Sequence, residues 1–341
     1  MESGLRVGEA MIRVSAPGRA GIIGNPTDMY GGSVISCSIT ERAYCELSRS
    51  EQSAIRMDGD AIALTGFESL ALDGGKFDLA KAALQALEMD PSAHKITISL
   101  RTDVPEQAGL AGSTAMLACA VGCLLAHLGI ELNKYELAET VRKIETDVMK
   151  ITCGYQDHYM AVFGGLNYMD FRGKEMTRQM KDEPFATIEP LSEVVGELPM
   201  ILAHTGVKRC SGSVHKSLRE RWLGGEEQVV EGYVRIAELG RLGKKALLAR
   251  DWKALGELMN ENHAIQRDLG GSGESNERLI EAALSHGALG AKLAGAGQGG
   301  TIIALTEDPD RLAKALLDAG ASRILTPKPT EGLVVEGGVV H

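Results

Sequence analysis

Three glycine-rich segments, far apart in this chain of 341 residues, constrain its fold more than any other feature. They are SAPGRAGIIGNPTDMYGG (15–32), PEQAGLAGSTAM (105–116) and KLAGAGQGGTIIAL (292–305). Glycine lets the backbone approach a ligand closely, and a helix that begins at such a loop adds the positive end of its dipole. The middle segment has this form because it leads into the apolar run MLACAVGCLLAHLGI. Together the segments predict a phosphate-handling site.

Two familiar phosphate motifs do not fit these segments. A P-loop needs a lysine followed by serine or threonine after its last glycine, and residues 109–114 contain no lysine. The third segment contains G-x-G-x-x-G, but the dinucleotide fingerprint requires a helix to begin there. The residues that follow are Thr-Ile-Ile-Ala-Leu, a short and β-branched run. This pattern indicates a strand, a glycine loop and a second strand, and so argues against a Rossmann domain.

Composition narrows the class of protein. A chain of 341 residues is too long for one ordinary core, which favours an enzyme of two domains. The net charge of -10 argues against a nucleic-acid binder, whose footprint is a basic patch. No apolar stretch reaches the roughly 18 residues of a membrane span, and no signal-peptide core is present, so we expect a cytoplasmic protein that contacts no membrane. The six cysteines show no zinc-site spacing and are interpreted as buried free thiols.

Periodicity predicts alternating strands and helices in the first half of the chain. The expected elements are strands over 11–16, 32–39, 43–48 and 95–101, helices over 77–89 and 134–149, and a strand over 164–171. A polar stretch from 173 to 197 is interpreted as the crossing between domains. A strand over 199–205 then opens a second unit, in which three or four helices fill 211–286. We expect its helices to pack on one face of a small antiparallel sheet.

In order and character, the three segments resemble the signature motifs of the GHMP kinases, the family of galactokinase, homoserine kinase, mevalonate kinase and phosphomevalonate kinase. The resemblance covers essentially the whole chain. It implies an α+β fold of two domains: an N-terminal domain like the second domain of ribosomal protein S5 (1–190) and a ferredoxin-like C-terminal domain (191–341). It also implies an active site between them, with ATP and Mg²⁺ as cofactors.

Within the family, RAGIIGNPTDMYGG, GYQDHYMAVFGGLNYMDF and CSGSVHKSLRERWLGGEE most resemble glucuronokinases, which phosphorylate the anomeric hydroxyl of glucuronate. Galactokinases carry Glu-His where this chain has Asn25 and Pro26, and a mevalonate kinase is expected to carry lysine in place of Arg19. We therefore expect ATP-dependent conversion of glucuronate to glucuronate 1-phosphate. The alternatives are a heptose 7-phosphate kinase, a mevalonate-type kinase, or a non-catalytic sugar and nucleotide sensor on the same fold.

The resemblance also assigns site residues. Asp157 is the expected catalytic aspartate and Arg19 its cationic partner, while Ser113 and Glu145 match the residues on the metal side. From the residues alone, Ser113 and Asp157 could equally be helix caps, and Glu145 could lie on a solvated helix face. The expected nucleotide-binding residues are Gly109, Leu110, Ala111, Gly112, Ser113, Thr114, Gly295 and Gly297.

The substrate side is expected to bind sugar hydroxyls and a carboxylate. A carboxylate needs a cation or a cluster of N–H donors, and residues 208–221 form the richest local supply of cations. The candidate residues are Asn25, Asp28, Tyr30, Arg209, His215 and Arg219. Asp28 could instead be a cap, the cations could form a solvated helix face, and isolated histidines such as His158 are interpreted as ordinary interior or surface residues. The expected partners are ATP and a sugar or uronic acid, in a monomer or homodimer.

Overall fold

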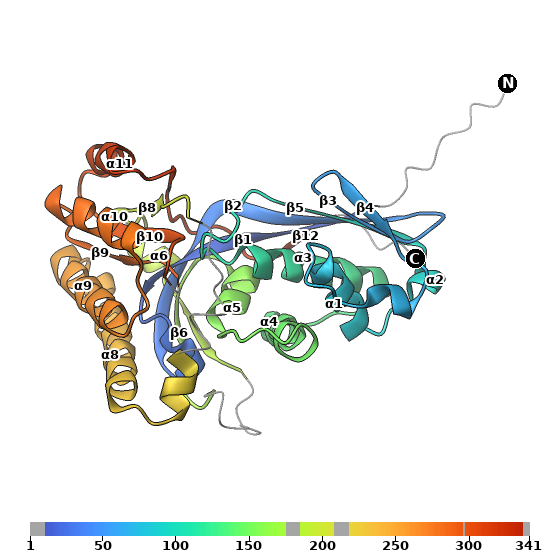
Figure 1. Ribbon diagram of the computed structural model, residues 1–341, viewed down its shortest axis with the longest axis horizontal. Coiled ribbons are helices and arrows are strands. Elements are labelled where there is room, and N and C mark those ends of the chain that lie inside the picture. The colour runs from blue at the N-terminus through green and yellow to red at the C-terminus, as the bar shows by residue number, and fades with distance from the viewer. Residues whose placement is uncertain (1–10, 175–184, 208–217, 296, 337–341) are drawn as a thin grey trace.

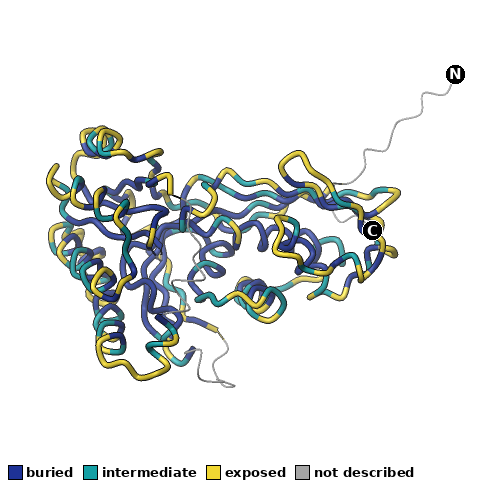
Figure 2. Tube along the Cα trace, in the orientation of Figure 1, coloured by how far each residue is buried: buried dark blue, intermediate teal, exposed yellow. Residues whose placement is uncertain are grey.

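The computed structural model describes residues 11–174, 185–207, 218–295 and 297–336, which form two units side by side (Figure 1). Each unit is built on a β-sheet with helices packed against it. Buried residues concentrate along the sheets and on the helix faces that cover them (Figure 2). In the described part of the chain, no helix has the length and apolar character that crossing a membrane requires.

The larger sheet has eight strands among the described residues, in the order β12-β1-β2-β5-β3-β4, with β6 beside β2 and β7 beside β6. Its neighbouring strands are antiparallel, except that β3 runs parallel to β5. The strands are β1 (Ile12–Ile23), β2 (Ser33–Arg49), β3 (Ala54–Met57), β4 (Asp60–Ala63), β5 (Ile96–Thr102), β6 (Leu166–Asp170), β7 (Thr187–Pro190) and β12 (Val334–Glu336).

Two strands are longer than their periodicity predicts. β1 continues through the glycine-rich segment, with register shifts between Pro17 and Arg19 and between Gly21 and Ile23. The strands expected over 32–39 and 43–48 form the single strand β2, since both stretches pair with β1. Long pairing to a neighbour therefore overrides the local interruption in the alternating pattern.

Helices cover one face of this sheet, and α3 lies at the centre of that layer (Figure 1). Every residue of α3 from 114 to 125 is buried, as its almost uninterrupted apolar sequence predicts. The elements are α1 (Asp78–Ala86), α2 (Pro91–His94), α3 (Gly112–Leu128), α4 (Lys134–Lys143), a π-helical turn (Ile144–Val148) and α5 (Gln156–Phe163), with short 3-10 turns at Thr27–Tyr30 and Phe67–Leu70. The helix expected over 134–149 is thus α4 followed by a π-helical turn.

The second unit contains the small antiparallel sheet expected from the sequence, in the order β11-β8-β10-β9. Alternate side chains of its strands enter two cores. One core packs under α10 and α11, and the other is shared with α8, α9, β1 and β2, so helices pack on both faces of this sheet and not on the one face expected. The elements are α6 (Ser192–Val195), β8 (Met200–His204), α8 (Glu227–Ala249), α9 (Trp252–Asp268), α10 (Glu274–Ser285), β9 (Gly290–Leu293), β10 (Thr301–Leu305), α11 (Pro309–Asp318) and β11 (Arg323–Leu325).

The chain crosses between the units more than once. The stretch interpreted as a crossing carries β7, which extends the larger sheet, and the short helix α6. After the second unit, β12 returns and pairs with β1, with Arg13 opposite Glu336. The last described strand therefore belongs to the sheet of the first unit. The boundary near residue 190 stays a prediction.

Candidate active site

All three glycine-rich segments meet at β1. The backbone N–H of Arg19 donates to the carbonyl oxygen of Leu110 at 2.9 Å, in the second segment. Two residues later, the N–H of Gly21 donates to the carbonyl oxygen of Ala294 at 3.1 Å, in the third segment. One strand of the first segment therefore fixes the positions of the other two.

The glycines of β1 are what permit this close approach. A Cβ atom at Gly18 would lie 2.8 Å from the carbonyl oxygen of Leu110, and one at Gly21 would lie 2.9 Å from that of Ala294. Both separations are shorter than a carbon and an oxygen tolerate without displacement of the backbone. Gly18 and Gly21 are thus needed for packing of the first segment against the other two, whether or not a ligand is bound.

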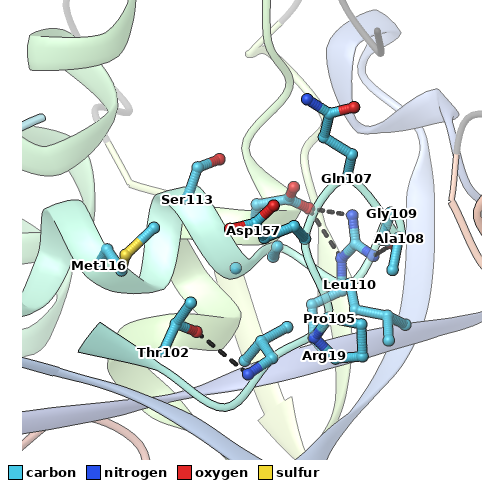
Figure 3. Close-up of a pocket in the computed structure, with 14 residues that line it drawn as sticks. Arg19, Thr102, Pro105, Gln107, Ala108, Gly109, Leu110, Ser113, Met116 and Asp157 are labelled. Carbon is cyan, nitrogen blue, oxygen red and sulfur yellow. Dashed lines mark hydrogen bonds and ion pairs between the residues drawn. The ribbon is translucent and has the colours of Figure 1, made fainter. Parts of the chain in front are cut away.

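The second segment encloses a cavity of about 310 Å³ (Figure 3). Gln107, Gly109 and Ala111 have positive φ angles of 50°, 74° and 60°, so the loop turns sharply before α3 begins at Gly112. Ser113 is the second residue of α3 and Ala111 its N-cap, which rules out the alternative of Ser113 as a cap. The cavity is lined by Arg19, Thr102, Val104, Pro105, Glu106, Gln107, Ala108, Gly109, Leu110, Ala111, Gly112, Ser113, Met116 and Asp157.

Arg19 and Asp157 form a charged pair on this cavity, with their side chains facing one another (Figure 3). Asp157 Oδ1 accepts from Arg19 Nε at 2.8 Å and from Nη2 at 2.5 Å. Arg19 Nη1 donates to the carbonyl oxygen of Gly109 at 2.5 Å, which ties the pair to the loop. Burial favours a higher pKa for Asp157, but the charges of Arg19 and His158 outweigh it and hold the pKa below its ordinary value. Asp157 is therefore ionised at neutral pH.

Asp28 lies at the same helix end as Asp157 but has different partners. Its Oδ2 accepts from the backbone N–H groups of Tyr155 at 2.8 Å and Gln156 at 3.0 Å, so it caps α5 from a distant part of the chain. A Cβ at Gly154 would lie 1.9 Å from the same oxygen, so glycine is needed there. Burial, helped by the charge of Asp157, raises the pKa of Asp28 despite these hydrogen bonds.

Asn25 connects the first segment to the third rather than lining the cavity. Its Oδ1 accepts from Lys292 Nζ at 2.8 Å, and its backbone carbonyl accepts from Asn262 Nδ2. Lys292 is fully buried, and burial together with the charge of Arg19 lowers its pKa to about 7. Lys292 was not predicted from the sequence. The only signal was its position at the start of the third glycine-rich segment.

Tyr30 lies in an aromatic cluster beside Asp28. Its ring centroid is 4.9 Å from that of Trp222 and 4.7 Å from that of Tyr233. Burial and the charge of Asp28 raise the pKa of Tyr30, and the nearby charge of Arg219 partly offsets this. The predicted residues Asp28, Tyr30 and Arg219 are therefore neighbours. Arg209 and His215 lie outside the described residues.

Glu145 is buried, with 4% of its surface exposed, which rules out the alternative of a solvated helix face. It lies in the π-helical turn, a distortion that is frequent at functional sites. Its Oε1 accepts from Thr114 Oγ1 at 3.0 Å, and its Oε2 lies 2.6 Å from His158 Nε2. Thr114 therefore faces Glu145 rather than the cavity, whereas Ser113, the residue before it, lines the cavity.

His158 lies in the interior, one of the two alternatives expected for it, and it has two polar side chains as neighbours. Its ring is fully buried between Glu145 and Cys153. Burial alone would lower the pKa of His158, but the carboxylate of Glu145 raises it to about 10. The sequence signal was weak, because His158 and Glu145 are thirteen positions apart, on either side of a loop.

The third segment forms the expected strand, loop and strand. β9 and β10 pair in antiparallel fashion, with Ile302 opposite Leu293, and no helix begins in the described residues between them. Gly297 has a positive φ of 89°, and a Cβ there would lie 1.8 Å from the carbonyl oxygen of Gly271. Gly295 is buried beside Ala294, the residue that accepts from β1. Packing thus sets the backbone conformation of the described residues of this loop, and strand–loop–strand pairing excludes a Rossmann dinucleotide-binding motif here.

Comparison with known proteins agrees with this arrangement. The model described as "GHMP kinases N terminal domain" matches residues 78–165, and the one described as "GHMP kinases C terminal" matches residues 244–322. A galactokinase galactose-binding signature matches residues 6–49. The chain belongs to the GHMP kinase family. The expected two-domain α+β fold is therefore confirmed, and GHMP kinases use ATP as their phosphate donor.

Relatives of this GHMP kinase differ in substrate. The chain is 30% identical to the mevalonate kinase of Thermococcus gammatolerans, over 95% of this chain and 98% of that protein. It is also 30% identical to probable glucuronokinase 2 of Arabidopsis thaliana, over 86% of this chain and 84% of the relative. A D-glycero-D-manno-heptose 1-phosphate kinase structure from Bacteriodes thetaiotaomicron has a TM-score of 0.74 at 22% identity, covering 95% of this chain and 98% of that one. The chain is thus a small-molecule kinase, and its acceptor is a separate question.

Proposed function

We propose that this GHMP kinase transfers the γ-phosphoryl group of ATP to a hydroxyl of a small, carboxylate-bearing alcohol, with the anomeric hydroxyl of glucuronate as the leading acceptor. The observation that carries the proposal is the Arg19–Asp157 pair, which lies on a cavity formed by a glycine-rich loop at the start of a helix. Phosphoryl transfer needs positioned phosphates and an oriented hydroxyl more than covalent help. This cavity combines groups for both tasks.

The loop supplies the nucleotide side of the proposed site. The residues from Gly109 to Ser113 line the cavity at the N-terminal end of α3, where backbone N–H groups and the helix dipole favour anions. We assign the β- and γ-phosphates to this position. Gly295 and Gly297 are assigned to the nucleotide through the third segment, which β1 holds beside the second.

Ser113 and Glu145 would hold magnesium. Their hydroxyl and carboxylate oxygens are the hard ligands that this ion prefers, and Glu145 is kept in place by hydrogen bonds from Thr114 and His158. Each carboxylate oxygen has a second lone pair left for an ion. When bound, magnesium neutralises charge on the phosphates.

Arg19 and Asp157 supply the acceptor side. Because Arg19 keeps Asp157 ionised, Asp157 can accept a hydrogen bond from the attacking hydroxyl and take its proton, whether that proton leaves before or after the new P–O bond forms. Arg19 in turn favours negative charge that develops on the acceptor oxygen. The hydrogen bond from Arg19 to Gly109 fixes the position of the acceptor side relative to the phosphate loop.

A carboxylate on the acceptor is the feature shared by glucuronate and mevalonate, the substrates named in the two relatives. Asp28 and Tyr30 would bind hydroxyls, and Arg219, whose charge acts on Tyr30, would pair with the carboxylate. We also assign Arg209 and His215 to this side, from the sequence alone. In the first glycine-rich segment, Arg19 argues against mevalonate and Asn25–Pro26 against galactose. Because the galactokinase galactose-binding signature also matches residues 6–49, galactose is tested beside glucuronate.

An ADP-release assay with glucuronate, glucose, galactose, mevalonate and heptose 7-phosphate tests the proposal. We expect glucuronate to be turned over best, and glucose at least about 100-fold less efficiently in kcat/KM, because the neutral sugar leaves a cation unpaired. The variant Arg219→Gln should narrow that ratio, whereas Arg241→Gln, an exposed arginine on α8, should not.

Other outcomes of this assay point elsewhere. Equal kcat/KM for glucuronate and glucose would overturn the uronate assignment and leave the kinase in place. Turnover of mevalonate or the heptose phosphate alone would reassign the acceptor. Binding of ATP and sugar by calorimetry, with no ADP released for any acceptor, would identify a sensor instead.

A further inference from the structure

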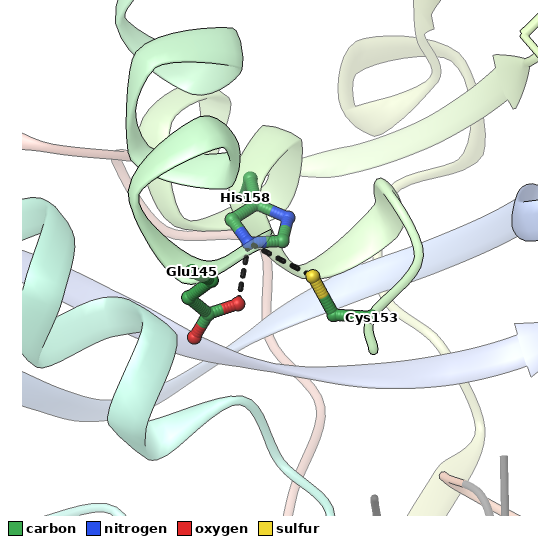
Figure 4. Close-up of side chains that lie close together, drawn as sticks. All are labelled: Glu145, Cys153 and His158. Atoms are coloured by element: carbon green, nitrogen blue, oxygen red, sulfur yellow. Dashed lines mark hydrogen bonds and ion pairs between the residues drawn. The ribbon is translucent and has the colours of Figure 1, made fainter. Parts of the chain in front are cut away.

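Glu145, Cys153 and His158 bring three different metal-ligating groups together beside the proposed active site (Figure 4). Glu145 comes from the π-helical turn, Cys153 from the loop that follows, and His158 from the first turn of α5. One ring nitrogen, His158 Nε2, lies 2.6 Å from Glu145 Oε2 and 4.0 Å from Cys153 Sγ. The three ligand atoms all lie within 4.8 Å of one another.

Small side-chain movements would bring the cluster to the spacing of a tetrahedral metal site. Zinc bonds of about 2.0 to 2.3 Å to oxygen, nitrogen and sulfur place ligand atoms of a tetrahedron roughly 3.3 to 3.7 Å apart. The carboxylate of Glu145 would have to move away from the ring by less than about 1 Å, and the sulfur of Cys153 would have to move toward it by a similar amount. Side-chain rotations on this scale need no rearrangement of the backbone.

The chemistry of the donors selects the kind of ion. A thiolate and an imidazole favour zinc and other borderline or soft divalent ions, whereas magnesium is bound by oxygen ligands. The remaining described cysteines, Cys37, Cys45, Cys119 and Cys123, are buried. Cys119 and Cys123 contact backbone carbonyl oxygens, and burial raises the pKa of the Cys37 thiol. Among the described residues, this is the group in which three potential metal ligands lie within 4.8 Å of one another.

The three ligand residues differ in exposure. Cys153 is half-buried, while Glu145 and His158 are buried behind it. Cys153 is therefore the most exposed of the three residues. Three protein ligands leave a fourth position for water, the arrangement of open zinc sites.

We propose that Glu145, Cys153 and His158 form a binding site for a thiophilic divalent cation of the zinc type, whose occupancy inhibits phosphoryl transfer. On binding, the ion gains bonds to sulfur, nitrogen and oxygen, while the thiol proton and the proton held between His158 and Glu145 pass to solvent; nothing is oxidised or reduced. Inhibition follows because a Glu145 carboxylate that is bound to zinc is not available to hold magnesium. The inhibitory part rests on the proposed role of Glu145, and the binding part does not.

Binding is tested with cobalt(II) added to the full chain without nucleotide. Cobalt bound to a thiolate gives a near-ultraviolet absorption, which zinc should abolish by displacing cobalt. Cys153→Ser should remove this absorption and weaken zinc binding, measured by calorimetry, about 100-fold or more, since it removes the soft ligand. The matched control Cys37→Ala, at a buried cysteine away from the cluster, should keep both. His158→Gln should also weaken zinc binding, with circular dichroism confirming that it folds.

The inhibitory part is tested by adding zinc to the kinase assay, with each variant scored relative to its own zinc-free rate. The parent chain and Cys37→Ala should lose activity at the zinc concentration that saturates the site, and Cys153→Ser should need about 100-fold more zinc. An unchanged cobalt absorption in Cys153→Ser, or none in the parent chain, overturns the site. Binding without inhibition overturns the competition with magnesium. A chain that binds zinc but phosphorylates nothing defeats the proposed function and leaves the site standing.

Discussion

Asp157 and Asp28 lie at the same end of α5, yet their surroundings shift their pKa values in opposite directions. Asp157 pairs with a guanidinium, which outweighs the cost of burial. Asp28 accepts two backbone N–H groups, which do not outweigh burial beside the charge of Asp157. Contact with a full positive charge thus lowers the pKa of a buried carboxylate, whereas hydrogen bonds from a helix end do not lower it enough to offset burial. The comparison separates an ionised carboxylate suited to proton transfer from a buried one suited to holding geometry.

The largest expected effect is a loss of kcat when Asp157 can no longer ionise. Asp157→Asn should lower kcat about 1000-fold, because the amide can accept a hydrogen bond but cannot take the proton of the attacking hydroxyl. In Asp28→Asn, one amide oxygen can still accept from both Tyr155 and Gln156, so kcat should fall less than about tenfold, with a rise in the acceptor KM. Steady-state kinetics of the two variants measure the difference. Equal losses of kcat would show that the two carboxylates do not have separate roles.

Removing the cation should make Asp157 more like Asp28. Arg19 lowers the pKa of Asp157, so in Arg19→Gln that pKa rises, and the acidic limb of the kcat/KM profile should move to higher pH. We also expect kcat to fall about 100-fold, since charge on the acceptor oxygen loses its partner. Arg13→Gln is the control, because Arg13 lies on the same strand and is exposed. An acidic limb at the parent's pH would mean that Arg19 does not set the ionisation of Asp157.

Two glycine substitutions separate the two sides further. Gly18→Ala presses on Leu110 in the loop that Arg19 contacts, and should raise the KM for ATP about tenfold. Gly154→Ala presses on Asp28 Oδ2 and should instead raise the KM for the acceptor by a similar factor. Varying ATP and acceptor in turn measures both constants. A rise in the same constant for both variants would contradict separate nucleotide and acceptor sides.

The sequence predicted the parts of this site that depend on local pattern. The loop before α3, the strand–loop–strand at 292–305 and the small antiparallel sheet all follow from glycine position and periodicity. The pairing of β12 with β1 does not, because strand partners so distant in the chain leave no local signal. Glu145 illustrates a second limit. A regular helix over 134–149 allows a solvated glutamate, but the π-helical turn changes the rotation per residue and accompanies its burial against Thr114 and His158.

The smallest expected effect concerns stability. The pKa of Asp28 is raised in the folded protein above its ordinary value of 3.8, so the folded state keeps this proton where the unfolded state has lost it. The resulting stabilisation is complete below the unfolded pKa and is lost as the pH rises through the folded pKa. For Asp157 the pKa is lowered, so its stabilisation is present above the unfolded pKa and is lost as the pH falls through the folded pKa.

The two asparagine variants should therefore show opposite trends in urea unfolding. As the pH rises from about 4 to about 7, the unfolding free energy of Asp28→Asn should improve relative to the parent chain, because the variant has no buried carboxylate to ionise. For Asp157→Asn the trend lies at lower pH: as the pH rises from about 2 to about 4, its unfolding free energy should worsen relative to the parent chain, because the parent gains the ionised partner of Arg19 and the variant does not. Each difference should be on the order of 1 kcal/mol, typical of single substitutions. Parallel trends in the two variants would show that burial, rather than the contact with Arg19, governs both carboxylates.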